Sequence, residues 1–114
     1  MTMRLPETEK SYQEWKGSGL LPGLHAEPVL FYWQYWRIVD NAAPHDRIAE
    51  EDKLVVLNRK SRLDELTYDE WRELFHIMMS LDNRFDATLF NFASMRSVED
   101  IPHLHLYKLK PEFK

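Results

Sequence analysis

The stretch 101–109 alternates polar and apolar side chains, and it constrains the fold more than any other part of the chain. Such alternation is typical of a half-buried β-strand, whose successive side chains point to opposite faces of a sheet. We therefore expect His103, His105 and Tyr107 on one face and the two intervening leucines on the other. A sheet that contains this strand needs a layer packed on its leucine face, and it holds two imidazoles in register on the opposite face.

A capping box predicts where that layer begins. Thr67 and Glu70 have the spacing at which an N-cap hydroxyl and a glutamate side chain satisfy each other's backbone donors. Apolar residues recur at helical spacing from there to position 85. The sequence therefore predicts an amphipathic helix over residues 68–84.

Four further segments are predicted as strands. Residues 31–39 are rich in aromatic and β-branched side chains, and residues 47–50 form a shorter candidate. Residues 53–58 contain four successive apolar positions, which is typical of a central strand, and residues 88–93 return to a strand pattern. The order of strands, one long helix and strands predicts an α+β fold with an antiparallel sheet of about five strands.

The chain divides into an N-terminal arm, residues 1–29, and a folded domain, residues 30–114. A short helix is expected over residues 7–16, followed by a stop at Gly17-Ser18-Gly19. Proline and glycine interrupt regular structure after that stop, while several leucines favour a loop held against the domain.

Composition excludes several function classes. The 114 residues include no cysteine, so disulfides, thiolate catalysis and cysteine-ligated zinc are absent. The net charge of -4 argues against a nucleic-acid groove, which needs clustered Lys and Arg. No apolar run approaches the ~20 residues of a membrane span, and charged residues stand where a signal peptide would be apolar. We expect a cytoplasmic protein without a membrane or nucleic-acid partner.

Two other interpretations compete for the histidine pair. The first places both imidazoles on the solvated face of an edge strand, without a function. The second is a metal site, since histidines at i and i+2 share an ion when a third ligand converges. His25, His45 and His76 have no evident ligand spacing to the pair, so we expect no metal.

Over residues 31–111, the chain resembles the histidine-triad (HIT) superfamily of nucleotide hydrolases and transferases. That family carries His-φ-His-φ-His-φ-φ on a strand near its end, where φ is apolar, and residues 103–109 match with Tyr107 in the third histidine position. The upstream segments similar to family patterns are Trp36 to Asn41, Pro44 to Ile48, and Leu66 to Leu74.

The resemblance implies a mechanism and its catalytic residues. His105, the middle position, would attack the α-phosphorus of a small nucleotide and form a nucleotidyl-imidazole intermediate. His103 would orient the catalytic groups, and Tyr107 would occupy the third catalytic position. The mechanism implies no cofactor and no metal.

The resemblance also implies substrate contacts and a partner. Asn91, Ser97 and Asn41 would bind the nucleotide. The family pairing of two protomers into a continuous sheet implies a homodimer, with Tyr32 and Trp36 facing a base pocket or the partner.

The alternative is a degenerate HIT-like domain that binds a nucleotide or a protein without catalysis. Tyr107 replaces a histidine, and Glu51 or Asp52 stands where active members carry another one. A carboxylate there is expected to repel a phosphate. Glu99 and Asp100 also replace the polar pair that precedes the triad.

Overall fold

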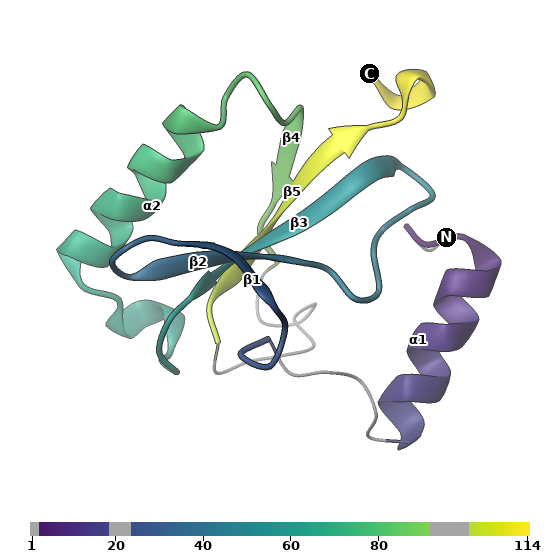
Figure 1. Ribbon diagram of the computed structural model, residues 1–114, viewed down its shortest axis with the longest axis horizontal. Coiled ribbons are helices and arrows are strands. Elements are labelled where there is room, and N and C mark those ends of the chain that lie inside the picture. The colour runs from purple at the N-terminus through teal and green to yellow at the C-terminus, as the bar shows by residue number, and fades with distance from the viewer. Residues whose placement is uncertain (1–2, 19–23, 92–100) are drawn as a thin grey trace.

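Five strands form one antiparallel sheet in the computed structural model, which describes residues 3–18, 24–91 and 101–114. The strands are β1 (Val29–Tyr32), β2 (Trp36–Asp40), β3 (Ala49–Leu57), β4 (Ala87–Leu89) and β5 (His103–Leu109). Their order across the sheet is β1-β2-β3-β5-β4, and they fill the centre of Figure 1. The predicted α+β class with an antiparallel sheet is confirmed.

Two helices stand at opposite ends of the view in Figure 1, α1 (Pro6–Ser18) and α2 (Tyr68–Ser80). Short 3₁₀ turns, η1 (Leu63–Glu65) and η3 (Pro111–Phe113), complete the described elements. Both helices have 13 residues, so the predicted arm helix is as long as the helix that packs on the sheet. In the described part of the chain, neither helix is long and apolar enough to cross a bilayer.

The predicted capping box begins α2. Thr67 accepts a hydrogen bond from the Glu70 amide at 3.1 Å, and the Glu70 carboxylate accepts one from the Thr67 amide at 2.8 Å. The helix ends at Ser80, four residues before the predicted boundary. The Leu81 amide donates to the carbonyls of Ile77 and Met78, which closes the last turn. The apolar spacing continues past this point because Leu81 and Phe85 still pack on the core from a turn.

The aromatic segment 31–39 is two strands, not one as predicted. The Trp33 amide donates to the Trp36 carbonyl at 2.8 Å, which makes a tight turn between β1 and β2. The Glu73 carboxylate on α2 accepts from the amides of Tyr35 and Trp36 at 2.7 and 3.2 Å. A side chain remote in sequence therefore stabilises the turn, which local pattern alone does not reveal.

The two candidate strands 47–50 and 53–58 belong to one strand, β3, which begins at Ala49. Residues before it form a turn, in which the amides of Ile48 and Ala49 donate to the His45 carbonyl. The prediction of a central strand is confirmed, because β3 lies between β2 and β5. Strand β4 is shorter than predicted, and residues 92–93 of that prediction lie outside the described residues.

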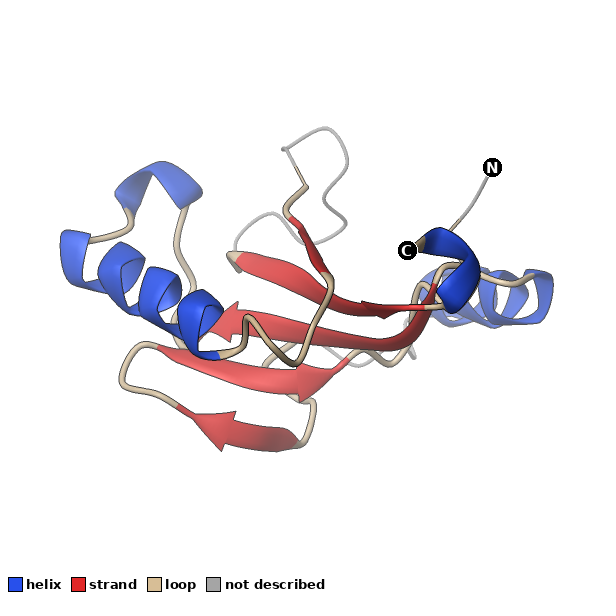
Figure 2. Cartoon of the chain, turned by 90° about the horizontal axis from the view of Figure 1, so that it is seen from above, coloured by secondary structure: helices blue, strands red, loops and turns tan. Residues whose placement is uncertain are grey.

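The main apolar core lies between the sheet and α2. Figure 2 shows the two long helices on opposite sides of the strands. The buried residues of this core are Trp36, Ile38, Val55, Leu57, Leu74, Ile77, Leu104 and Leu106. Trp36 is 0% exposed, and its Nε1 donates to the Glu70 carbonyl at 2.8 Å. The expectation that Trp36 faces a pocket or partner is therefore wrong, whereas Tyr32 is 58% exposed.

Candidate functional site

The histidine strand lies inside the sheet rather than at its edge. Strand β5 pairs with β3 on one side and with β4 on the other. His103 and His105 are both buried, at 8% and 7% exposed. The interpretation that places both imidazoles on the solvated face of an edge strand is therefore wrong. The predicted alternation is confirmed, because Leu104 and Leu106 lie in the core beneath α2.

Asp52 is the centre of the polar face. In the sheet register Asp52 stands opposite Tyr107, two pairs along from the pairing of Leu54 with His105. Its carboxylate accepts three hydrogen bonds, from His105 Nδ1 at 2.9 Å, the His45 amide at 3.0 Å and Asn41 Nδ2 at 2.9 Å. The Asp52 side chain is 0% exposed. A buried charge is tolerated only when hydrogen-bonded in this way, so the three donors account for its presence.

His45 completes a compact group with Tyr107. The two side chains are joined by a hydrogen bond of 2.5 Å between His45 Nδ1 and the Tyr107 hydroxyl. The His45 ring stacks on the His105 ring, with centroids 4.5 Å apart and planes 16° apart. We call His45, Asp52, His105 and Tyr107 the Asp52 cluster. Sequence reasoning missed His45 because the turn before β3, and not any spacing, brings it to β5.

Burial and hydrogen bonding set the ionisation of the Asp52 cluster. Burial opposes the charged form of Asp52, but hydrogen bonds from His105, His45 and Asn41 outweigh it and lower the pKa of this carboxyl. Burial, with the neighbouring charge of His105, lowers the pKa of His45 to about 4. Burial, with the charge of Asp52, raises the pKa of the Tyr107 hydroxyl. At neutral pH the cluster therefore holds a charged Asp52, a neutral His45 and a protonated Tyr107.

The expectation that a carboxylate at this position repels phosphate stays a prediction, and the structure adds that Asp52 is buried within β3. Its charge is directed into hydrogen bonds with three donors, one of them the ring of His105. Asp52 is thus placed to orient His105. Glu51, the other residue considered, is exposed on β3.

His103 lies beside the Asp52 cluster. Its ring centroid is 6.1 Å from that of His105, and its Nδ1 lies 2.8 Å from the Ile101 carbonyl oxygen. A carbonyl accepts only, so Nδ1 of His103 carries a hydrogen. Both imidazoles therefore have a fixed ring orientation, through a backbone carbonyl for His103 and a carboxylate for His105.

Of the three predicted substrate residues, the structure describes Asn41 and Asn91 but not Ser97. Asn41 uses its amide within the protein, donating to Asp52 and accepting from the Ala43 amide at 3.0 Å. It therefore positions Asp52. Asn91 follows β4 and is half-buried, while Ser97, Glu99 and Asp100 lie outside the described residues.

The N-terminal arm lies against the turn that carries His45. Arg4 Nε donates to the Ala43 carbonyl at 2.8 Å, and the Leu5 amide donates to Asp46 Oδ1 at 2.8 Å. Met3 Sδ lies 3.9 Å from the Tyr107 hydroxyl. The arm is thus anchored beside the Asp52 cluster although it is remote in sequence.

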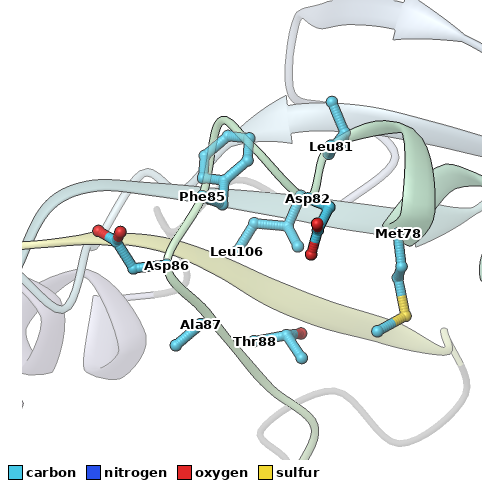
Figure 3. Close-up of a pocket in the computed structure, with 8 residues that line it drawn as sticks. All are labelled: Met78, Leu81, Asp82, Phe85, Asp86, Ala87, Thr88 and Leu106. Carbon is cyan, nitrogen blue, oxygen red and sulfur yellow. The ribbon is translucent and has the colours of Figure 1, made fainter.

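An open hollow lies on the opposite face of the sheet. Figure 3 shows it between the end of α2 and the strands β4 and β5, with Met78, Phe85 and Thr88 among its lining residues. Leu106 from β5 also lines it. Because Leu106 and His105 point to opposite faces, this hollow is separate from the Asp52 cluster.

His45, Asp52 and His105 also form a set of potential metal ligands, with one donor atom from each within 4.8 Å of the others. His45 has no evident ligand spacing to the histidine pair in the sequence, but in the structure it converges with His105 and Asp52 rather than with His103. The arrangement offers two chemistries, an oriented imidazole nucleophile and a nitrogen–oxygen ligand set.

The chain matches no family model, no curated protein and no solved structure.

Proposed function

We propose that this protein is a HIT-like hydrolase or transferase that acts at the α-phosphate of a small nucleotide, with His105 as the nucleophile. The observation that carries the proposal is the buried hydrogen bond of 2.9 Å between His105 Nδ1 and Asp52 Oδ1. When the ring is neutral, a proton held on Nδ1 by Asp52 leaves the lone pair on Nε2. An imidazole fixed in this tautomer is a prepared nucleophile.

The proposed reaction has two steps. Nε2 of His105 attacks the α-phosphorus, an N–P bond forms, and the bond to the leaving group breaks as that group takes up a proton from solvent. The nucleotidyl-imidazole carries positive charge, which the Asp52 carboxylate stabilises across the ring. Water or a second acceptor then breaks the N–P bond and restores the neutral ring.

The neighbours of His105 have supporting roles in this proposal. His103, held through the Ile101 carbonyl, orients the transferred group. Tyr107 bonds His45 at 2.5 Å and is a positioning residue rather than a replacement for the third imidazole. Asn91 remains a proposed nucleotide contact. Suitable substrates are nucleoside phosphoramidates, dinucleoside polyphosphates and nucleotidyl conjugates.

Nucleotide release tests the proposal directly. The wild-type protein is incubated with adenosine phosphoramidate and with a dinucleoside polyphosphate, beside H105A, D52N and the surface control H76A. We expect H105A to lose turnover and D52N to lose about 10²–10⁴-fold, because the wrong tautomer of His105 then predominates. His76 lies exposed on α2, so H76A should match wild type. Equal release by wild type and H105A would refute the nucleophile.

The second candidate is a degenerate HIT-like domain that binds without chemistry. The close stacking of His45 on His105, and the low exposure of both rings, favour it. In that case nucleotide binds with similar affinity to wild type and H105A, and neither protein releases product. Equilibrium dialysis with a non-hydrolysable nucleotide separates this outcome from an inactive protein that does not bind.

We also propose that the protein forms a homodimer. Large apolar side chains are exposed on α2 and β1, and they are Tyr68, Trp71, Phe75, Met79, Leu30 and Phe31. Exposed aromatic side chains of this kind are enriched at interfaces. Light scattering after size-exclusion chromatography should give twice the monomer mass, and F75E should shift it towards the monomer.

A further inference from the structure

We propose that His45, Asp52 and His105 form a binding site for one divalent transition-metal ion, and that Zn²⁺ fits its donor set. Two imidazole nitrogens and one carboxylate oxygen are ligands typical of zinc. The three residues come from the turn before β3, from β3 and from β5, so the fold assembles the set from distant parts of the chain. This inference does not depend on the proposed nucleotide chemistry.

The distances support a shared ion. Ligands bound at about 2.1 Å to one tetrahedral ion lie about 3–4 Å from each other. The atoms at the site are separated by 2.9 Å between His105 Nδ1 and Asp52 Oδ1, and by 3.9 Å between His45 Nδ1 and Asp52 Oδ2. The rings of His45 and His105 are stacked with planes 16° apart, so they must turn relative to each other for both nitrogens to face one ion.

The surroundings of Asp52 favour a cation. Among the described residues, its ion-pair partners within 4 Å are the two histidines, so no Lys or Arg described there neutralises the buried carboxylate. Asn41 and the His45 amide both bond Oδ2, which fixes the carboxylate and directs Oδ1 towards His105. Such outer contacts orient the ligands of metal sites.

Binding requires two hydrogens to move, one on His105 and one on Tyr107, and the protein neither gains nor loses a proton. The ring of His105 moves its proton from Nδ1 to Nε2 through solvent, so that Nδ1 presents a lone pair to the ion. The Tyr107 hydroxyl, 2.5 Å from His45 Nδ1, turns its hydrogen towards Met3 Sδ at 3.9 Å. His45 Nδ1 then also presents a lone pair, and the hydroxyl oxygen becomes available as a fourth ligand.

The site has a consequence for catalysis if His105 is a nucleophile. An ion on Nδ1 leaves the proton on Nε2, which removes the lone pair that would attack phosphorus. Bound Zn²⁺ should therefore inhibit nucleotidyl transfer rather than assist it.

The test is competition for Zn²⁺ against a chromophoric chelator, using the intact metal-free protein. We expect one Zn²⁺ per chain in wild type and in H76Q, with affinity reduced at least 10–100-fold in H45Q and D52N. Mg²⁺ should not displace Zn²⁺. No stoichiometric binding in wild type, or an equal loss in H76Q, would overturn the proposal.

A measurement on wild type avoids the risk that a buried variant fails to fold. Long-range ¹H–¹⁵N spectra of the imidazole rings should show Nδ1 of two histidines shifting with one equivalent of Zn²⁺. His25 and His76 should not shift. Shifts confined to exposed His76, or no shift at all, would contradict the site. Zinc binding together with no turnover by the metal-free protein would leave this inference intact and refute the proposed function, and turnover by the metal-free protein without zinc binding would do the reverse.

Discussion

The two faces of the sheet use the same strands but are stabilised by different physics. Beneath α2, the side chains from β3 and β5 are apolar and gain free energy simply by leaving water. On the opposite face, the same strands contribute Asp52, His105 and Tyr107, which are buried as deeply. Burying those groups is unfavourable unless each finds a partner, and each does. The opposite face also buries an apolar cluster of Val39, Leu54, Val56 and Ile101. The comparison teaches that the face beneath α2 is stabilised mainly by apolar burial, while the other face combines apolar packing with costly polar groups, which points to function.

The largest effect should follow removal of Trp36 from the apolar face. Trp36→Ala deletes a fully buried ring and the indole hydrogen bond to the Glu70 carbonyl. We expect a loss of about 3–5 kcal/mol in the free energy of unfolding, measured by urea denaturation. Trp71, 42% exposed on α2, is the matched control, and Trp71→Ala should lose less than about 1 kcal/mol. Similar losses in the two variants would contradict the assignment of the core.

Lowering the pH should reduce the free energy of unfolding through the polar face of the sheet. His45 has a pKa lowered to about 4 by burial, whereas it protonates near pH 6.5 when unfolded. As pH falls, His45 therefore gains a proton in the unfolded chain before it does so in the folded protein. The stability that neutral His45 contributes above pH 6.5 is lost progressively between pH 6.5 and pH 4. We expect wild type to lose about 2–3 kcal/mol over this window by urea denaturation.

His45→Gln should flatten this pH dependence, because the titrating ring is gone. His76→Gln removes an exposed histidine and should keep the wild-type slope. A slope unchanged in His45→Gln would show that another group titrates over this range.

Neutralising Asp52 should also lower the free energy of unfolding through the polar face of the sheet. Asp52→Asn keeps the shape but removes the charge and replaces one acceptor oxygen with a donor, which weakens the charge-assisted hydrogen bonds and forces His105 into its other tautomer. The expected cost is about 1–3 kcal/mol by thermal or urea denaturation. Asp40 pairs with Lys53 near the surface, and Asp40→Asn should change stability by less than about 1 kcal/mol. Equal effects would mean that burial of the Asp52 carboxylate is unimportant.

The smallest effect is expected at the start of α2. Thr67→Ala removes the hydroxyl that accepts from the Glu70 amide, which should cost about 1 kcal/mol by urea denaturation. Thr67→Ser keeps the hydroxyl and should restore most of the loss. Failure of serine to restore stability would assign the effect to the lost methyl group instead.

Local patterns predicted the parts of the fold that local physics determines. Alternation at 103–109 gave the two faces of β5, and the spacing of Thr67 and Glu70 marked the start of α2. The turn between β1 and β2 was missed, because it depends on Glu73 from α2. Helix α2 ended early because apolar spacing does not distinguish a last helical turn from a turn that still packs on the core.

The candidate site was only half predictable. His103, His105 and Tyr107 were visible as a strand face, but the partners of His105 were not. Asp52 reaches His105 through the register of β3 against β5, and His45 arrives through a turn. Neither contact has a signature in sequence spacing. Sequence position alone therefore did not reveal that the Asp52 carboxylate accepts a hydrogen bond from the ring of His105.

The most direct test of the central claim, that Asp52 prepares His105 as a nucleophile, is to trap the covalent intermediate. Wild type and D52N are mixed with radiolabelled adenosine phosphoramidate, quenched in alkali and mapped by peptide mass spectrometry. The account predicts a nucleotidyl adduct on His105 in wild type and a strongly reduced adduct in D52N. An adduct on another residue, an equal adduct in D52N, or none in a wild-type protein that still releases nucleotide, would contradict it.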